Sequence, residues 1–245
     1  MTNLPNIDLT TLSTEELEQM RDAGELVREC YRVLGKTSDN VVGEILKGEE
    51  TFFEWNHYPD GDVYDGVTHS QFYYHAHEAG DRPGEHGHCH TFLRPDGMPS
   101  GIAPAPVADY EPPEDPDDAL SHIIAISMDP KGFPTKLFTT NRWVTDEVWY
   151  TASDVCRLLY CFDIDHTQPS WPVNIWITNM LILFRPQIKE MIYARDAAVE
   201  AWRQDHPDTN VFEDRELEVT SEMLIDVDEQ LVQVQQALAA RDAGG

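Results

Sequence analysis

Residues 71–92 read QFYYHAHEAGDRPGEHGHCHTF, and this stretch decides the fold of the central part of the chain. Histidine alternates with other residues twice, as HAH at positions 75–77 and as HGHCH at positions 86–90. A period of two is typical of a β-strand, and the Gly and Pro residues between the two runs are typical of a turn. The sequence therefore predicts two strands joined as an antiparallel hairpin.

The spacing also predicts where the imidazole rings point. Residues two apart along a strand project from the same face, about 6 to 7 Å apart. His75 and His77 should share a face, as should His86, His88 and His90 on the next strand. If the two strands pair, up to five rings line one patch, although a row of three spans about 13 Å and cannot all reach one ion.

Such a patch predicts a transition-metal site. Clustered imidazoles are costly to bury unless something binds their lone pairs, and a metal ion removes that cost. We expect a mononuclear or dinuclear centre built from His75, His77 and two of the next three histidines, with His86 and His88 as the ligands of choice. Nitrogen ligands suit iron, zinc, copper and nickel. Iron is favoured over zinc or copper because nearby aromatic residues would exclude water; these are Trp55, Phe72, Tyr73, Tyr74 and Phe92. A hydrogen-bonded histidine network without metal and a solvent-exposed histidine strip are the alternatives.

Other residues are candidates for chemistry beside the metal. Glu85 and His90 could carry protons, and Tyr73 alternates onto the face of His75, where it could supply a phenol. Arg82 and Arg94 could clamp a carboxylate or phosphate, because basic residues are scarce in this chain. Structural salt bridges are the alternative for both arginines, and core packing is the alternative for Tyr73.

Three further features near the two histidine runs are less specific. His122 begins a later predicted strand and could reach the site from it. Cys89 should face away from His88, into the core. The segment HYPDGDVYDG at positions 57–66 reads as a tight acidic turn, since the ligand order of an EF-hand is missing, and it could bring His57 or its acidic residues toward the patch.

The remaining sequence predicts an α+β fold, with a central, mainly antiparallel sheet at about residues 51–140 flanked by N-terminal and C-terminal helices. We expect one domain in three parts: a helical segment 1–50, a His-rich β region 51–150 and a helical region 151–245. Strands are expected at 51–56, 71–77, 86–94, 122–128, 135–140 and 217–219. Helices are expected at 14–35, 40–46, 153–162, 171–184 and 185–204. The Pro-rich, acidic segment 98–118 reads as a surface loop or a lid.

A last apolar stripe runs through Leu224, Val227, Leu231, Val234 and Leu238 at spacings of three and four. This spacing predicts a helix that packs on its own domain, and the alternative is the seam of a homodimer.

Composition limits the partners. The chain has 245 residues, with 45 Asp and Glu against 17 Lys and Arg, and a formal charge of −28. Such a surface repels phosphate backbones and anionic lipids, so we expect no nucleic acid and no membrane as partner, and a small molecule as substrate or ligand. The N-terminus lacks the features of a secretory signal, which favours the cytoplasm.

The strings HYPDGDVYD (57–65), SQFYYHAH (70–77) and RPGEHGHCHTFLR (82–94) resemble a family of uncharacterised bacterial proteins. The resemblance is clear over residues 57–94 and loose elsewhere, and the family has no assigned activity to carry over. From the residues alone we expect a metal-dependent enzyme, with a non-haem iron oxygenase or other oxidoreductase acting on a small molecule ahead of a zinc hydrolase. A metal- or haem-binding module without turnover and a pH-sensitive interaction patch are the alternatives.

Overall fold

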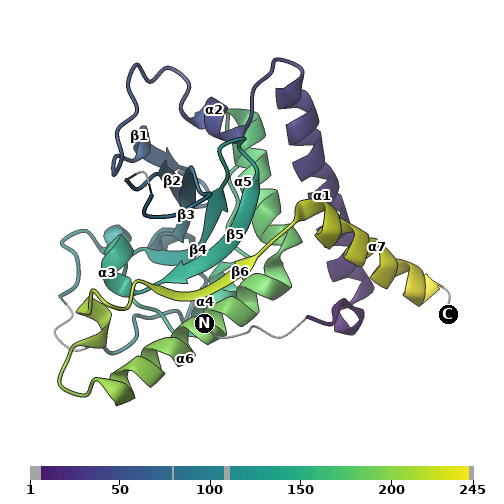
Figure 1. Cartoon of the computed structure of the whole chain (residues 1–245). Helices are drawn as coiled ribbons and strands as arrows, with labels where there is room; N and C mark the ends of the chain where they lie inside the picture. The colour runs from purple at the N-terminus through teal and green to yellow at the C-terminus, as the bar shows by residue number, and fades with distance from the viewer. Residues whose placement is uncertain (1–6, 79, 108–110, 243–245) are drawn as a thin grey trace.

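The computed structural model describes residues 7–78, 80–107 and 111–242, and within them it shows a six-stranded antiparallel sheet with helices, an α+β fold as predicted (Figure 1). The strands follow one another in chain order across the sheet: β1 (Tyr58–Tyr64), β2 (Ser70–His75), β3 (Gly87–Leu93), β4 (Ser121–Met128), β5 (Pro134–Thr140) and β6 (Val219–Leu224). The α-helices are α1 (Thr14–Gly35), α2 (Val41–Ile45), α3 (Arg142–Thr145), α4 (Ala152–Leu158), α5 (Trp171–Leu183), α6 (Arg185–Asp205) and α7 (Val227–Asp242).

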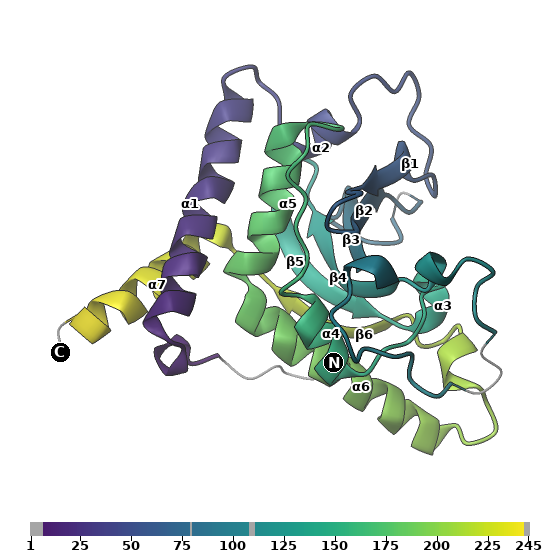
Figure 2. The ribbon, with the colours of Figure 1, turned by 180° about the vertical axis from the view of Figure 1, so that it is seen from behind.

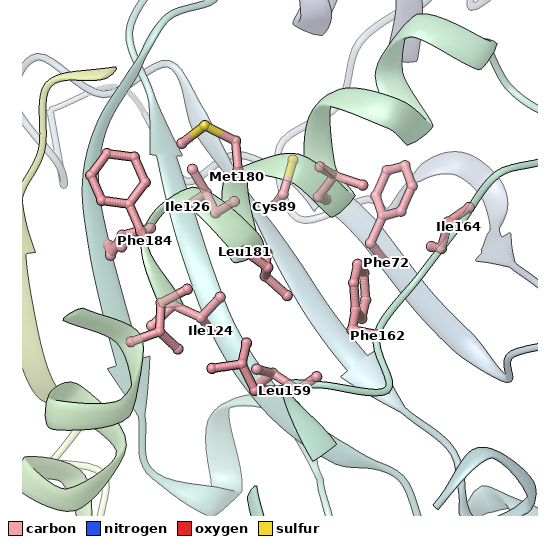
Figure 3. Close-up of a cluster of buried hydrophobic side chains, with 14 of the residues drawn as sticks. Phe72, Cys89, Ile124, Ile126, Leu159, Phe162, Ile164, Met180, Leu181 and Phe184 are labelled. Atoms are coloured by element: carbon pink, nitrogen blue, oxygen red, sulfur yellow. The ribbon is translucent and has the colours of Figure 1, made fainter. Parts of the chain in front are cut away.

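One face of the sheet forms the hydrophobic core. Figure 3 shows sheet residues meeting side chains of α5 and of the segment that follows α4. The sheet contributes Phe72, Cys89, Ile124 and Ile126; α5 and its C-terminal cap contribute Met180, Leu181 and Phe184; and the segment after α4 contributes Leu159, Phe162 and Ile164. The helix α5 is apolar almost all round because α1 packs on its outer side, away from the sheet (Figure 2).

The predicted hairpin forms between β2 and β3. His75 pairs with His88, and Tyr74 pairs with Cys89, so histidines lie opposite histidines and core residues opposite core residues. Gly87 is required in this pairing because a Cβ there would lie 2.5 Å from the hydroxyl oxygen of Tyr74. The buried Cys89 confirms the predicted alternation.

The first strand differs from the prediction. The structure has no strand at 51–56, and β1 instead covers the segment that reads as an acidic turn. Gly61 and Asp62 adopt positive φ values of 80° and 59°, which shifts the register between Tyr58 and Val63. Turn-forming residues here make a β-bulge within a strand rather than ending it.

The C-terminal stripe packs largely within the chain. Val227, Leu231 and Val234 are buried, and α7 lies against α1 (Figure 2). Leu224 is 81% exposed. A homodimer therefore stays a prediction. Within the described residues, every helix is too short or too polar to cross a membrane.

Candidate metal centre

The face of the sheet that turns away from α5 carries the histidines. His75 ends β2, and His88 and His90 lie on β3, where the cross-strand pairing brings the Nε2 atoms of His75 and His88 to 2.6 Å from each other. The His90 ring lies 4.8 Å from the His88 ring and 5.2 Å from the His75 ring, between centroids. Each of the three residues offers a ring nitrogen, and these nitrogens all lie within 4.8 Å of one another.

This spacing suits a single transition-metal ion. Nitrogen ligands at about 2.0–2.1 Å from a tetrahedral ion lie about 3.3 Å apart, so shifts of about 1 Å would bring the three rings into register. The Nε2 of His90 is buried and has no hydrogen-bond partner among the described residues. An unsatisfied buried ring nitrogen beside two others is a costly arrangement that an ion would relieve.

Hydrogen bonds to the far sides of two rings fix their orientation. Glu85 Oε1 lies 2.7 Å from His88 Nδ1 and accepts a hydrogen bond from the Nδ1–H group, which leaves the His88 Nε2 lone pair facing the cluster. Carboxylates commonly hold metal-binding histidines in this way.

The second ring is held from β4 and β5. His90 Nδ1 lies 3.0 Å from His122 Nε2, and His122 Nδ1 lies 3.5 Å from Thr140 Oγ1. If His122 donates to Thr140 and His90 donates to His122, the His90 Nε2 is left as a lone pair. The backbone N–H of His122 donates to Glu147 Oε2 at 2.7 Å.

Burial keeps the rings neutral. His88, His90 and His122 are each at most 1% exposed. Burial lowers the pKa of His75 to about 2, with the neighbouring His88 as the next cause, and lowers the pKa of His122 to about 3. Burial also holds the pKa of His88 and His90 well below the usual value. At neutral pH all four rings are therefore neutral, and His75, His88 and His90 each keep one nitrogen lone pair of the kind that a metal needs.

Two of the four histidines predicted as ligands lie outside the group of three, although His77 shares the face of His75 as predicted. His86 precedes β3 and bonds through Nδ1 to the Tyr74 hydroxyl at 2.6 Å, on the core side of the sheet, so its expected place beside His88 is wrong. Alternation does not extend to His86 because the regular strand begins one residue later. The His77 ring lies 5.2 Å from the His75 and His88 rings, at the rim, and packs against Trp55 at 4.4 Å.

The other candidate residues surround the cluster. Tyr73 lies on the histidine face as expected, with its ring 5.6 Å from the His75 ring. Arg82 pairs with Glu218 and stands 5.0 Å from the centre of the Phe138 ring. Arg94 pairs with Asp118 at 2.6 Å, so both arginines are engaged in salt bridges.

Three residues contribute more to the histidine face of the sheet than the sequence indicates. His57 stacks on the Tyr73 ring at 3.6 Å, and Phe138 of β5 lies 5.0 Å from the His88 ring. His122 reaches this face only because a register shift between Thr91 and Phe92 turns it away from the core. The parity of β4 alone would have placed His122 with Ile124, in the core.

In the described part of the segment 98–118, the residues near its middle pack away from the rings, against another part of the chain. Ala105 and Val107 pack beside Trp149 and Phe212, and the amide of Ala105 donates to the carbonyl of Trp149 at 2.8 Å. Residues 108–110 of this segment lie outside the described residues.

The fold and the site define an α+β protein in which one face of an antiparallel sheet carries a buried histidine group that could hold a metal ion. The chain belongs to the family described as a domain of unknown function (DUF6969), which matches residues 21–225 and so includes the whole sheet. A search of curated proteins and a search of solved structures each found no match.

Proposed function

We propose that this protein is a metal-dependent enzyme in which His75, His88 and His90 hold one iron(II) ion and a small molecule is oxidised beside it. The observation that carries the proposal is the meeting of three ring nitrogens within 4.8 Å, one of them buried and without a partner. This ligand set differs from the one expected from sequence, in that His90 replaces His77 and His86 and is no longer a proton carrier.

Three protein ligands leave positions on an ion for other molecules, which is the usual arrangement in catalytic rather than structural sites. Bound iron would supply a redox centre for dioxygen. Side chains of the protein would shield the ligand rings and orient them. Phe92 and Phe138 shield the ligand rings from water, while Glu85 and His122 keep two rings in the ligating orientation.

The open side lies toward β1. His75 is less deeply buried there than His88 and His90, and Tyr73, His77 and His57 stand around it. A substrate approaching from this side would meet a phenol and two imidazoles able to exchange protons, which are suitable groups for acid–base work. We assign the proton-transfer role to these residues in place of Glu85, whose carboxylate is occupied by His88.

The first test is metal content. Protein purified without a histidine tag is analysed by elemental mass spectrometry, and we expect one iron per chain. His88→Ala should remove it. His86→Ala is the matched control, because His86 is close in sequence but bonds to Tyr74 on the other face. Equal metal loss in both variants, or none in either, would contradict the ligand assignment.

The second test is for an open position. Nitric oxide added to the iron(II)-loaded protein under argon should give the electron paramagnetic resonance signal of a high-spin iron–nitrosyl, and His88→Ala should give none. Zinc in place of iron would favour the zinc hydrolase. Iron that binds no nitric oxide would favour a metal carrier without turnover.

A further inference from the structure

A cleft of about 690 Å³ lies next to the histidine cluster, on the same face of the sheet. Its floor includes Gln71 of β2, which alternates with Tyr73 and His75, and its wall includes His57, Asp62 and Arg94. Clefts of this volume are typical of sites for small molecules.

His57 joins the cleft to the proposed metal centre. Its ring lines the cleft, stacks on Tyr73 with centroids 3.6 Å apart, and lies 5.9 Å from the His75 ring. The Trp55 amide donates to the Ala76 carbonyl at 2.9 Å, which fixes the loop before β1 against the end of β2. A molecule in the cleft would therefore be separated from the ligand rings only by His57 and Tyr73.

The wall of the cleft is held in place by a chain of hydrogen bonds. Arg94 Nε donates to Gln71 Oε1 at 2.7 Å, and Gln71 Nε2 donates to Asp62 Oδ2 at 2.7 Å. The other oxygen of Asp62 lies 3.2 Å from His57 Nδ1. Side chains that are ordered before a ligand arrives lose little entropy on binding, so this wall is suited to recognition.

The charge of the cleft favours a cation. The carboxylates of Glu49 and Asp60 line it without a partner among the described residues, whereas the one lining guanidinium, Arg94, is balanced by Asp118 outside the cleft. The Phe53 ring also lines the cleft and is 56% exposed. An aromatic face beside carboxylates is the usual setting for ammonium groups, and the charge of −28 draws cations toward the chain.

We propose that this cleft binds a small organic cation, an amine or a quaternary ammonium compound, and that this cation is the substrate of the metal centre. The second part rests on the proposed function, whereas cation binding does not. The carboxylate or phosphate ligand expected for Arg94 from sequence becomes the opposing outcome of the test.

The test compares probes of equal shape and different charge. Butylammonium and choline are titrated against the full chain by ligand-detected NMR, beside their uncharged isosteres 1-butanol and 3,3-dimethylbutanol and the anion valerate. We expect at least one cation to bind about tenfold more tightly than its isostere, a difference of about 1.4 kcal/mol. Glu49→Gln with Asp60→Asn should remove this preference, and Glu54→Gln, an exposed neighbour that does not line the cleft, should retain it.

The outcomes separate the two proposals. Cation preference lost in the double variant but present in His88→Ala supports the cleft whatever metal is found. No preference for either cation, tighter binding of valerate, or a preference that survives the double variant would overturn the cleft proposal. If cations bind but do not change the nitrosyl signal of the iron-loaded protein, the cleft is a cation site but is not the substrate site of the metal centre.

Discussion

The two faces of the sheet are buried to a similar degree but for opposite energetic reasons. Ile124, Ile126 and Cys89 are fully covered by helices, and their burial stabilises the fold. His88, His90 and His122 are as deeply buried on the other face, where desolvation of imidazole opposes folding. A face that costs stability is retained for what its groups do, so the comparison directs attention to the histidine side as the functional one.

The largest effect of a single substitution should come from the core face. Ile126→Ala removes a fully buried side chain and should cost about 2–5 kcal/mol, measured by urea unfolding of the metal-free protein. The metal affinity of the folded fraction should not change, because Ile126 points away from the rings. A large loss of affinity with little loss of stability would break the division of roles between the faces.

The second effect is acid sensitivity of the histidine face. The pKa of His122 is about 3 in the folded chain and about 6.5 when unfolded. The unfolded chain therefore binds a proton first as the pH falls below 6.5, and the free energy of unfolding decreases. At pH 5 this loss is about 2 kcal/mol for one such group, and His75, His88 and His90 act in the same direction.

Glu147 opposes this trend. Burial raises its pKa to about 8, so its contribution to the free energy of unfolding is present at low pH and is lost as the pH rises through 8. The stability gained by protonating one carboxyl is smaller than the stability lost through four rings. We therefore expect the metal-free protein to lose stability as the pH falls from 6.5 to 5, as measured by urea titrations. His206→Ala, outside the cluster, should keep the same slope, and a stability that rises on acidification would contradict the buried neutral rings.

The third effect tests the support behind the ligands. Glu85→Ala removes the acceptor from His88 Nδ1 and should weaken metal binding about 10–100-fold, as measured by competition with a chelator. Glu85→Gln, which can still accept the bond, should recover part of the affinity. Equal affinity in all three proteins would show that Glu85 does not position His88.

The smallest effect is expected at His86, which lies on the core side of the sheet rather than beside His88. Tyr74→Phe removes the hydroxyl that bonds to His86 and should cost about 1 kcal/mol of stability in urea unfolding. Metal content should stay the same. Loss of metal in this variant would mean that His86 is coupled to the centre after all.

The sequence predicted those parts of the fold in which local pattern and tertiary structure agree. The helix expected at 14–35 has these bounds in the structure, where Ser13 and Glu16 form a capping box at its start, and alternation through residues 71–92 predicted the hairpin and the faces of His75, His88 and Cys89. These features depend on near neighbours in the chain, which a pattern can report.

The errors arose where one irregular residue changes the parity of a strand. A bulge at Gly61 and Asp62 makes a strand out of a turn-like segment, and another near Phe92 puts His122 on the histidine face. Because β3 begins at Gly87, His86 lies before the regular strand and does not follow its alternation. The hydrogen-bond chain through Asp62, Gln71 and Arg94 joins β1, β2 and the residue that follows β3, and no local pattern reveals it.

The chain-order arrangement of β1 to β5 also affects synthesis of the protein. Every ring of the cluster precedes Thr140, whereas α5 begins at Trp171. When β5 has just emerged from the ribosome, the nascent chain already carries all three proposed ligands, while the apolar face of its sheet still lacks the helix that will cover it. Metal captured at that moment would tie β2 to β3 before α5 emerges, and would guard an incomplete sheet against association with other chains.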